Sequence, residues 1–239
     1  MTAVGILLVT GSARSTIIDV DTTAGNGADS YISSFPGRHD TNFGSEDAFF
    51  LKNDFGGGFV NRKGYLRFDL SSIADPITNA NLALSFVEDT HITFATWVFN
   101  VYGLSDGHSG ENWLETGITW NNAPANDTSS GGGLLGGQAS LLGAFSIDTF
   151  LLAPGDIVNF SSSALTNFLQ VDTNDLVTLI LIRQDLTLSK VGFATKEHTD
   201  FQAPTLTLST TVNPVPEPDT LLLMCLGLAG IGYWRYKVA

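Results

Sequence analysis

The chain contains a single cysteine, Cys225, and it lies close to the C-terminus. A lone cysteine excludes an intramolecular disulfide, and no cluster of thiolates is available to bind a metal. The body of the protein must therefore be stabilised by its hydrophobic core, with or without a bound ion.

Basic residues are also scarce. The sequence has 11 Lys and Arg against 24 Asp and Glu, which gives a net charge of −13 at pH 7. Such a field repels polyanions, so nucleic acid is not expected as a partner. Binding of the body to a membrane surface is not expected for the same reason.

The sequence also lacks the usual catalytic motifs. It has no Walker loop, no G-x-G-x-x-G after a strand and no H-E-x-x-H. Its histidines lack the spacing of a zinc site: His39, His91, His108 and His198. Acid pairs such as Glu115 with Asp106, or Asp69 with Glu197, form by chance in so acidic a chain. We therefore expect no enzymatic activity.

Long apolar runs are absent except at the C-terminus, where Leu221 to Trp234 are uncharged. As a helix this run reaches only roughly 21 Å, against about 30 Å for the hydrocarbon core of a membrane. It has no polar face, so burial in a soluble core is not favoured. The run predicts a marginal membrane anchor helix at residues 220–239, after a proline-rich spacer at residues 212–219.

The order of residues at this end resembles the PEP-CTERM sorting signal of Gram-negative bacteria that make exopolysaccharide. The resemblance is carried by Pro216, Glu217 and Pro218, by the apolar run, and by a basic tip at Arg235. The tip departs from an unbroken arginine cluster, because Tyr236 separates two basic residues. The resemblance implies transient anchoring in the inner membrane, recognition by an exosortase, and a secreted or cell-surface location.

The opposite end also favours export. Residues 1–15 have a short apolar core followed by small residues, which is typical of a signal peptide, but lack a basic start. We interpret them as a truncated signal peptide. A disordered or strand-forming terminus is the alternative. The remaining residues, 16–211, are of a suitable length for one all-β domain.

Within this body, apolar side chains alternate at period two in segment after segment, and turn residues separate the segments. The segments include residues 48–51, 65–70, 82–86, 97–102, 176–182 and 206–208. Only residues 161–170 predict a helix, with Ser162 or Ser163 as its N-cap. The pattern predicts an all-β antiparallel β-sandwich, a jelly roll of about ten strands with one short helix.

A second resemblance lies within the body. Asn61 to Ile73, Trp113 to Pro124 and Val191 to Glu197 follow one another in an order and spacing similar to the DNRLRE domain, also called carbohydrate-binding module family 96. The resemblance covers roughly residues 28–210. It implies a β-sandwich, an extracellular setting and an acidic polysaccharide such as alginate as ligand.

Alternation along residues 63–69 places Lys63, Tyr65 and Arg67 on the face opposite the core. Arginine binds carboxylates with paired hydrogen bonds, and tyrosine packs against sugar rings. A solvated sheet face without ligand shows the same pattern, so both interpretations stay open. The predicted ligand-binding residues are Lys52, Arg62, Lys63, Tyr65, Arg67 and Lys196.

Oxygen donors near predicted strand ends suggest a structural calcium ion, as in many sandwich-type carbohydrate modules. Calcium needs six to eight oxygens, and no loop has the spacing of an EF-hand, so the site must combine remote segments. The predicted ligands are Asp29, Asp40 and Glu197. By contrast, the motif from Trp113 to Pro124 is interpreted as mostly structural, with Ile118 and Trp120 in the core.

These observations predict a secreted, non-catalytic protein that associates with an acidic extracellular polysaccharide. The alternative is a structural protein of the extracellular matrix or cell surface without specific sugar binding. A polysaccharide lyase or hydrolase is a third possibility.

Overall fold

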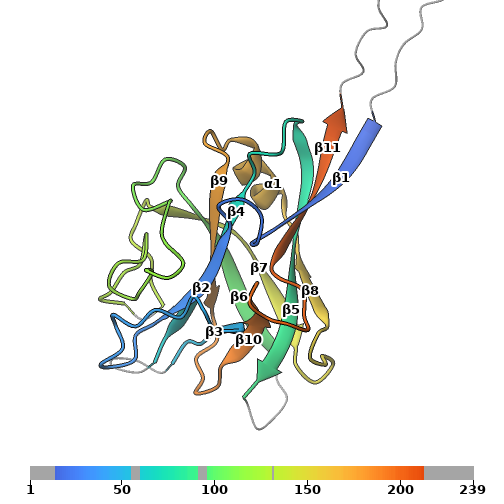
Figure 1. The fold of residues 1–239 in the computed structure, drawn as a ribbon. Helices are drawn as coiled ribbons and strands as arrows, with labels where there is room; N and C mark the ends of the chain where they lie inside the picture. The colour runs from blue at the N-terminus through green and yellow to red at the C-terminus, as the bar shows by residue number, and fades with distance from the viewer. Residues whose placement is uncertain (1–13, 55–59, 91–95, 131, 213–239) are drawn as a thin grey trace, which may run out of the picture. The chain divides into compact units, whose positions relative to one another are not determined.

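The computed structural model describes residues 14–54, 60–90, 96–130 and 132–212. Residues 17–210 form one compact unit. The described chain forms eleven β-strands and one short helix in two antiparallel sheets (Figure 1). The predicted β-sandwich is confirmed. The predicted sorting signal and anchor, and most of the predicted signal peptide, lie outside the described residues.

The first sheet has six strands, in the order β1-β11-β5-β10-β3, with β8 pairing with β5. Their bounds are β1 Arg14–Asp21, β3 Ala48–Leu51, β5 Ile77–Asp89, β8 Ile157–Phe160, β10 Val191–Ala194 and β11 Thr205–Val212. The predicted boundary at residue 15 falls within β1. Within the described residues, no helix is long and apolar enough to cross a membrane.

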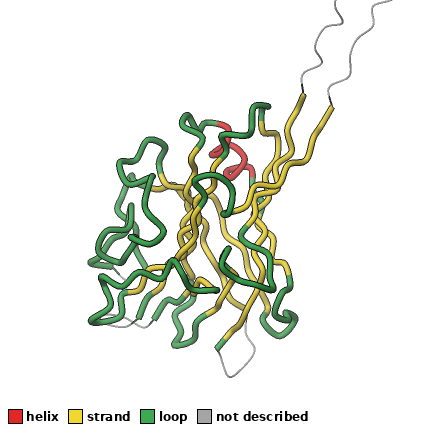
Figure 2. The backbone as a smooth tube through the Cα atoms, in the orientation of Figure 1, coloured by secondary structure: helices red, strands yellow, loops and turns green. Residues whose placement is uncertain are grey.

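The second sheet has five strands, in the order β2-β4-β9-β6-β7. Their bounds are β2 Ala28–Ser33, β4 Arg62–Asp69, β6 Thr96–Leu104, β7 Ala139–Asp148 and β9 Leu176–Arg183. Figure 2 shows the two layers of strands and the long loops beside the five-stranded layer. Strands β2 and β3 are therefore edge strands of their sheets.

The helix α1 spans Ser163–Gln170. Ser162 is its N-cap, because the Ser162 hydroxyl accepts a hydrogen bond from the Leu165 backbone N–H at 2.9 Å. Leu165 and Leu169 are buried and Phe168 packs against the core, so the helix buries one apolar face.

Aromatic rings dominate the core between the two sheets. Phe193 of β10 is fully buried, and its ring centroid lies 5.6 Å from that of Phe49, 5.8 Å from that of Phe99 and 6.5 Å from that of Phe86. Edge-to-face and tilted pairs of this kind join strands of both sheets. Residues 48–51 and 97–102 thus form strands, as their alternation predicts, and Phe49 and Phe99 point into the core.

Strand β7 was missed by the sequence analysis because a bulge interrupts its alternation. The pairing of β6 with β7 shifts register between Val101 and Tyr102, opposite Gly143. Gly143 has a φ of 143°, a region that favours glycine. Leu142, the unpaired residue of the bulge, is buried, as are Phe145 and Ile147 after it, so the period of two is broken.

A second hydrophobic cluster lies on the outer face of the five-stranded sheet. It joins Ile32, Tyr65 and Ile180 of the strands to apolar residues between β6 and β7. The latter are Trp113, Ile118, Trp120, Ala123 and Ala125. We call residues 105–138 the covering loop, which appears in green beside β2 and β4 in Figure 1. Strands β2, β4 and β9 are thus buried on both faces, whereas β7 has exposed side chains.

We expect Phe193→Ala to destabilise the protein by about 3–5 kcal/mol, because it removes a ring from the centre of the core. Phe150→Ala is the matched control, since Phe150 is 63% exposed. Urea denaturation of both variants measures the difference. Equal free energies of unfolding for the two variants would contradict this placement of the core.

Candidate functional site

The side chains of Lys63, Tyr65 and Arg67 share one face of β4, as the alternation predicts. The expectation that this face is exposed is wrong: Lys63 and Tyr65 are 0% exposed and Arg67 is 6% exposed. The covering loop lies on this face, and period-two alternation cannot distinguish a solvated face from a covered one. These three side chains therefore offer no free surface to a polysaccharide.

Lys63 and Tyr65 instead hold the middle of the covering loop. The Tyr65 hydroxyl donates a hydrogen bond to the Pro124 carbonyl at 3.0 Å. The Lys63 ammonium donates to the Asn126 side-chain oxygen at 2.7 Å and to the Gly133 carbonyl, and it lies 4.8 Å from the centre of the Trp120 ring. Each buried donor thus has a partner in the loop.

Arg67 holds the beginning of the covering loop. Its guanidinium donates to the Trp113 carbonyl and, at 2.7 Å, to the Asn26 carbonyl, and it lies 5.1 Å from the Trp113 ring. The Trp113 indole N–H donates to the Thr178 hydroxyl at 3.1 Å. The structural interpretation of the Trp113 to Pro124 motif agrees with these contacts.

Burying these cations changes their acidity. Burial lowers the pKa of Lys63 to about 7, against a weaker opposing effect of Asp127. Burial also lowers the pKa of Arg67, against the charges of Glu115 and Asp69. The cost of removing these charged groups from water therefore offsets part of the free energy by which they stabilise the docked covering loop.

The other predicted ligand-binding residues lie elsewhere. The backbones of Lys52 and Arg62 form an isolated bridge, and the Lys52 ammonium lies 3.0 Å from an Asp54 carboxylate oxygen. The Lys196 ammonium lies 2.6 Å from a Glu115 carboxylate oxygen. The six predicted residues therefore do not form one surface.

Basic side chains gather at the β3 edge, around the rings of Tyr31 and Phe50. The Arg62 guanidinium lies 5.3 Å from the centre of the Tyr31 ring and 5.6 Å from that of Phe50, and the Lys190 ammonium lies 3.3 Å from the Phe50 ring. Burial raises the pKa of Tyr31, and the nearby charges of Arg62 and Arg38 oppose that rise. We call the set Arg38, Phe50, Lys52, Arg62 and Lys190 the basic edge.

The basic edge is only partly neutralised. Lys190 forms an ion pair with Glu88 at 2.8 Å and Lys52 pairs with Asp54. Among the residues that the structure describes, Arg38 and Arg62 form no ion pair. Arg38 is exposed and Arg62 is half-buried, so both can meet a ligand.

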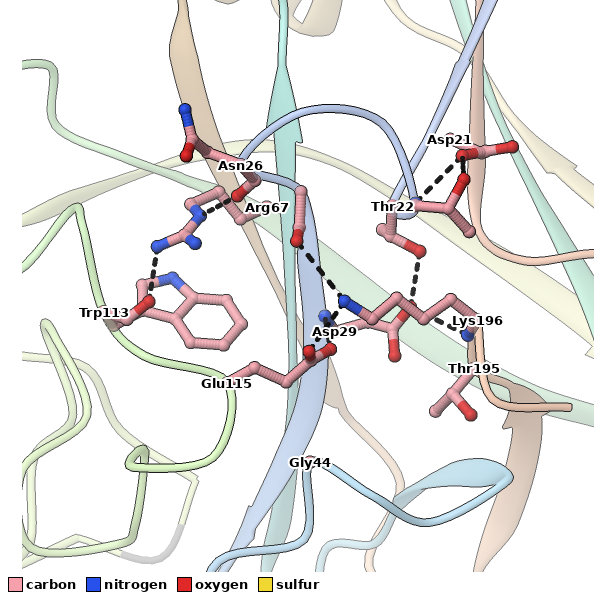
Figure 3. A network of polar contacts seen from close by, with 12 residues as sticks. Asp21, Thr22, Asn26, Asp29, Gly44, Arg67, Trp113, Glu115, Thr195 and Lys196 are labelled. Carbon is pink, nitrogen blue, oxygen red and sulfur yellow. Dashed lines mark hydrogen bonds and ion pairs between the residues drawn. The ribbon is translucent and has the colours of Figure 1, made fainter.

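Three carboxylates converge at the other end of β2: Asp29, Glu115 and Glu197 each offer an oxygen, and these oxygens lie within 4.8 Å of one another. Figure 3 shows Asp29 and Glu115 of this group. We call this set the Asp29 triad. The group can hold a metal ion. Of the predicted ligands, Asp29 and Glu197 are thus brought together, whereas Asp40 accepts a hydrogen bond from the Asn121 side chain at 2.8 Å.

The Asp29 triad has an unusual electrostatic environment. Burial raises the pKa of Asp29 to about 7, and the charges of Glu197 and Glu115 raise it too, against hydrogen bonds from Thr22 and from the Lys196 backbone. Burial also raises the pKa of Glu197, together with the charge of Glu115. Two carboxyl groups of raised pKa thus lie beside a third carboxylate, that of Glu115.

A second acidic group, Asp106, Glu111 and Asp172, also has the geometry to hold a metal ion. It borders a surface hollow of about 410 Å³ that His108 and Asn112 help to line. Thr173 donates to Asp106 and Asn174 donates to Glu111, each at 2.6 Å.

Sequence patterns assign neither Glu115 to the metal site nor Lys190 to the basic edge. Glu115 lies between two tryptophans of a motif interpreted as structural, and only the folded loop brings it to β2. One available signal was the nearly continuous apolar run from Val177 to Ile182, which is typical of a strand buried on both faces.

The described residues thus form a small all-β domain, an antiparallel sandwich. One sheet face is covered by a loop, and the domain has a basic edge and an acidic triad. Residues 20–135 match carbohydrate-binding module family 96, and residues 214–237 match the PEP-CTERM protein-sorting motif. The chain therefore contains a domain of carbohydrate-binding module family 96 and a C-terminal PEP-CTERM sorting motif.

Both predicted resemblances are thus confirmed, the first over residues 20–135 rather than over roughly 28–210. The second match includes Pro216, Glu217, Pro218 and Arg235, which lie outside the described residues. The motif marks a protein that an exosortase sorts to the cell surface or the outside. Neither match is a catalytic domain. No curated protein matches the sequence significantly.

Lys63→Met should change how stability depends on pH. The folded pKa of Lys63, about 7, lies below the ordinary value of 10.5, so the unfolded chain binds more protons between these two pH values. This lysine therefore makes the wild-type protein more stable as pH rises from about 7 to 10, by up to about 1.4 kcal/mol per pH unit.

Urea denaturation of wild type and Lys63→Met at pH 6 to 10 measures this contribution. We expect the variant to be less stable at every pH, because Asn126 and Gly133 lose a partner, and to show a smaller rise with pH. Parallel curves would mean that the Lys63 pKa is not lowered.

Proposed function

We propose that this protein binds an acidic extracellular polysaccharide, such as alginate, without catalysing its cleavage. The match to carbohydrate-binding module family 96 carries this proposal. The sorting motif supports it, because export delivers the domain to where such polysaccharides accumulate. We include passage through the inner membrane of a Gram-negative bacterium, with residues 1–15 as signal peptide and residues 220–239 as transient anchor.

The basic edge is the surface that suits a carboxylated sugar chain. Arg62 and Arg38 are free of ion pairs among the described residues, and guanidinium groups bind carboxylates through paired hydrogen bonds. The surface combines these donors with a half-buried Phe50 ring. Lys52 and Arg62 thus remain proposed ligand-binding residues, with Arg38 and Lys190 added.

The net charge of −13 does not prevent this binding. At physiological salt the Debye length is about 8 Å, so distant acids are largely screened from a ligand at the basic edge. Lys63, Tyr65 and Arg67 contribute indirectly in this proposal, because they hold the covering loop. Lys196 pairs with Glu115 of the Asp29 triad, away from the basic edge, and is likewise not proposed as a contact residue.

A structural calcium ion belongs to the same proposal. Calcium binds carboxylate oxygens, and the sites that it occupies commonly join remote loops. The Asp29 triad supplies such oxygens. The ion stabilises the domain and takes no part in sugar contact, since the triad does not lie in the basic edge.

Affinity electrophoresis in gels that contain alginate tests the proposed function. The wild-type protein should be retarded, and Arg62→Ala should bind about tenfold more weakly, because it loses a charged hydrogen-bond donor. Arg14→Ala is the matched control, since it removes the same charge from β1 and should leave the retardation unchanged.

Raising the salt to 1 M should weaken the retardation, because the Debye length falls to about 3 Å. Equal migration with and without alginate would favour a structural protein that binds no sugar. Release of unsaturated or shortened oligosaccharides would instead favour a lyase or hydrolase.

A further inference from the structure

The three carboxylates of the Asp29 triad come from segments far apart in the chain. Asp29 lies in β2, Glu115 lies in the covering loop, and Glu197 follows β10. Figure 3 shows the side chains of Asp29, Glu115 and Lys196 close to one another, with the covering loop approaching β2. The triad is therefore a junction of three elements.

Two carboxylate oxygens of this triad have no hydrogen-bond partner. Asp29 is 0% exposed, and its Oδ1 is buried without a partner, as is Oε2 of Glu197. Among the described residues, these are the only buried carboxylate oxygens without one. Because an unpaired buried carboxylate is costly, two such oxygens in one cluster point to a bound cation.

The remaining oxygens of the triad show where a cation has to fit. Asp29 Oδ2 accepts from the Thr22 hydroxyl and from the Lys196 backbone N–H at 3.0 Å. Glu115 Oε1 accepts from the Asp29 backbone N–H at 2.9 Å, and its Oε2 faces the Lys196 ammonium at 2.6 Å. These contacts fix the carboxylates and leave the two unpartnered oxygens available.

The charges near the triad match a divalent ion. Three ionised carboxylates and the Lys196 ammonium leave two negative charges. The Arg67 guanidinium, whose pKa responds to Glu115, is also close to Asp69, which offsets it. A divalent cation therefore neutralises the junction.

The ligand set favours calcium over magnesium. Three carboxylates of the chain offer oxygens within 4.8 Å of one another. Calcium takes six to eight oxygens in flexible geometry, whereas magnesium usually keeps several waters and binds through one or two carboxylates. Three converging carboxylates therefore suit calcium.

We propose that Asp29, Glu115 and Glu197 bind one Ca²⁺ that fastens the covering loop to β2 and to the segment after β10. This inference deepens the calcium part of the proposed function and does not depend on sugar binding. Lys196 is a competing counter-charge at the site, since its ammonium lies 2.6 Å from Glu115 Oε2 and 3.5 Å from the Gly27 carbonyl oxygen.

Thermal unfolding of the full chain in CaCl₂ and in EDTA tests the site. Calcium at about one hundred times its Kd should raise the wild-type Tm by about 5–10 °C. Asp29→Asn should lose this rise. In EDTA the same variant should melt above wild type, because it replaces an unpaired buried carboxylate with a neutral amide.

Asp106→Asn is the matched control, because it makes the same change in the second acidic group, whose hydrogen bonds from Thr173 and Asn174 leave its carboxylates partnered. It should keep the full calcium response. Titration calorimetry should give a lower Kd for calcium in Lys196→Met than in wild type.

Equal wild-type Tm values in CaCl₂ and EDTA, or an intact calcium response in Asp29→Asn, would overturn the site. A response to MgCl₂ as large as that to CaCl₂ would overturn the choice of ion. Retardation in alginate without a calcium response would refute this inference alone. A calcium response without retardation would refute only sugar binding.

Discussion

The fold depends on one constraint: the polar side chains of β4 are buried under the covering loop and must find hydrogen-bond partners there. Lys63, Tyr65 and Arg67 reach the carbonyls of Gly133, Pro124 and Trp113 respectively. Because each group has a partner in the loop, the path of a segment with little regular secondary structure is fixed. Strands β2, β4 and β9 are thereby covered on both faces.

Closing that face decides where a ligand can bind. The cations that alternation places on β4 stabilise the covering loop, so the positive charge left for a partner lies at the edge of the sandwich. There Arg62 and Lys190 flank the Phe50 ring. The same loop carries Glu115 to the Asp29 triad, so loop docking and the proposed cation site are linked through one short segment.

Local sequence patterns identified most of the strands but not their surroundings. Residues 48–51 form β3 as predicted, and Ser162 caps the helix. Alternation also identified the core face of β4 correctly. It could not reveal that the opposite face is covered, because the covering loop is held by contacts between residues distant in the sequence, such as Lys63 and Asn126, which are 63 positions apart. At Gly143 a bulge removed the alternation itself.

The candidate site shows the same division. Asp29 and Glu197 were identified as oxygen donors near strand ends, whereas Asp40 lies apart from them and Glu115 completes the triad. Which acids converge depends on the docking of the covering loop, and no local pattern encodes that. Two tryptophans beside Glu115 were the available hint, since rings of that size need a buried face such as the outer side of β4 and β9.

Amide hydrogen exchange of the covering loop tests the central claim most directly. If the loop is a packed layer of the fold, the backbone N–H groups of Ala123 and Asn126, which are hydrogen-bonded within it, should be protected nearly as well as those of β4. Exchange of these amides at the rate of an unfolded chain, with β4 still protected, would contradict the account and reopen the Lys63, Tyr65 and Arg67 face to ligand.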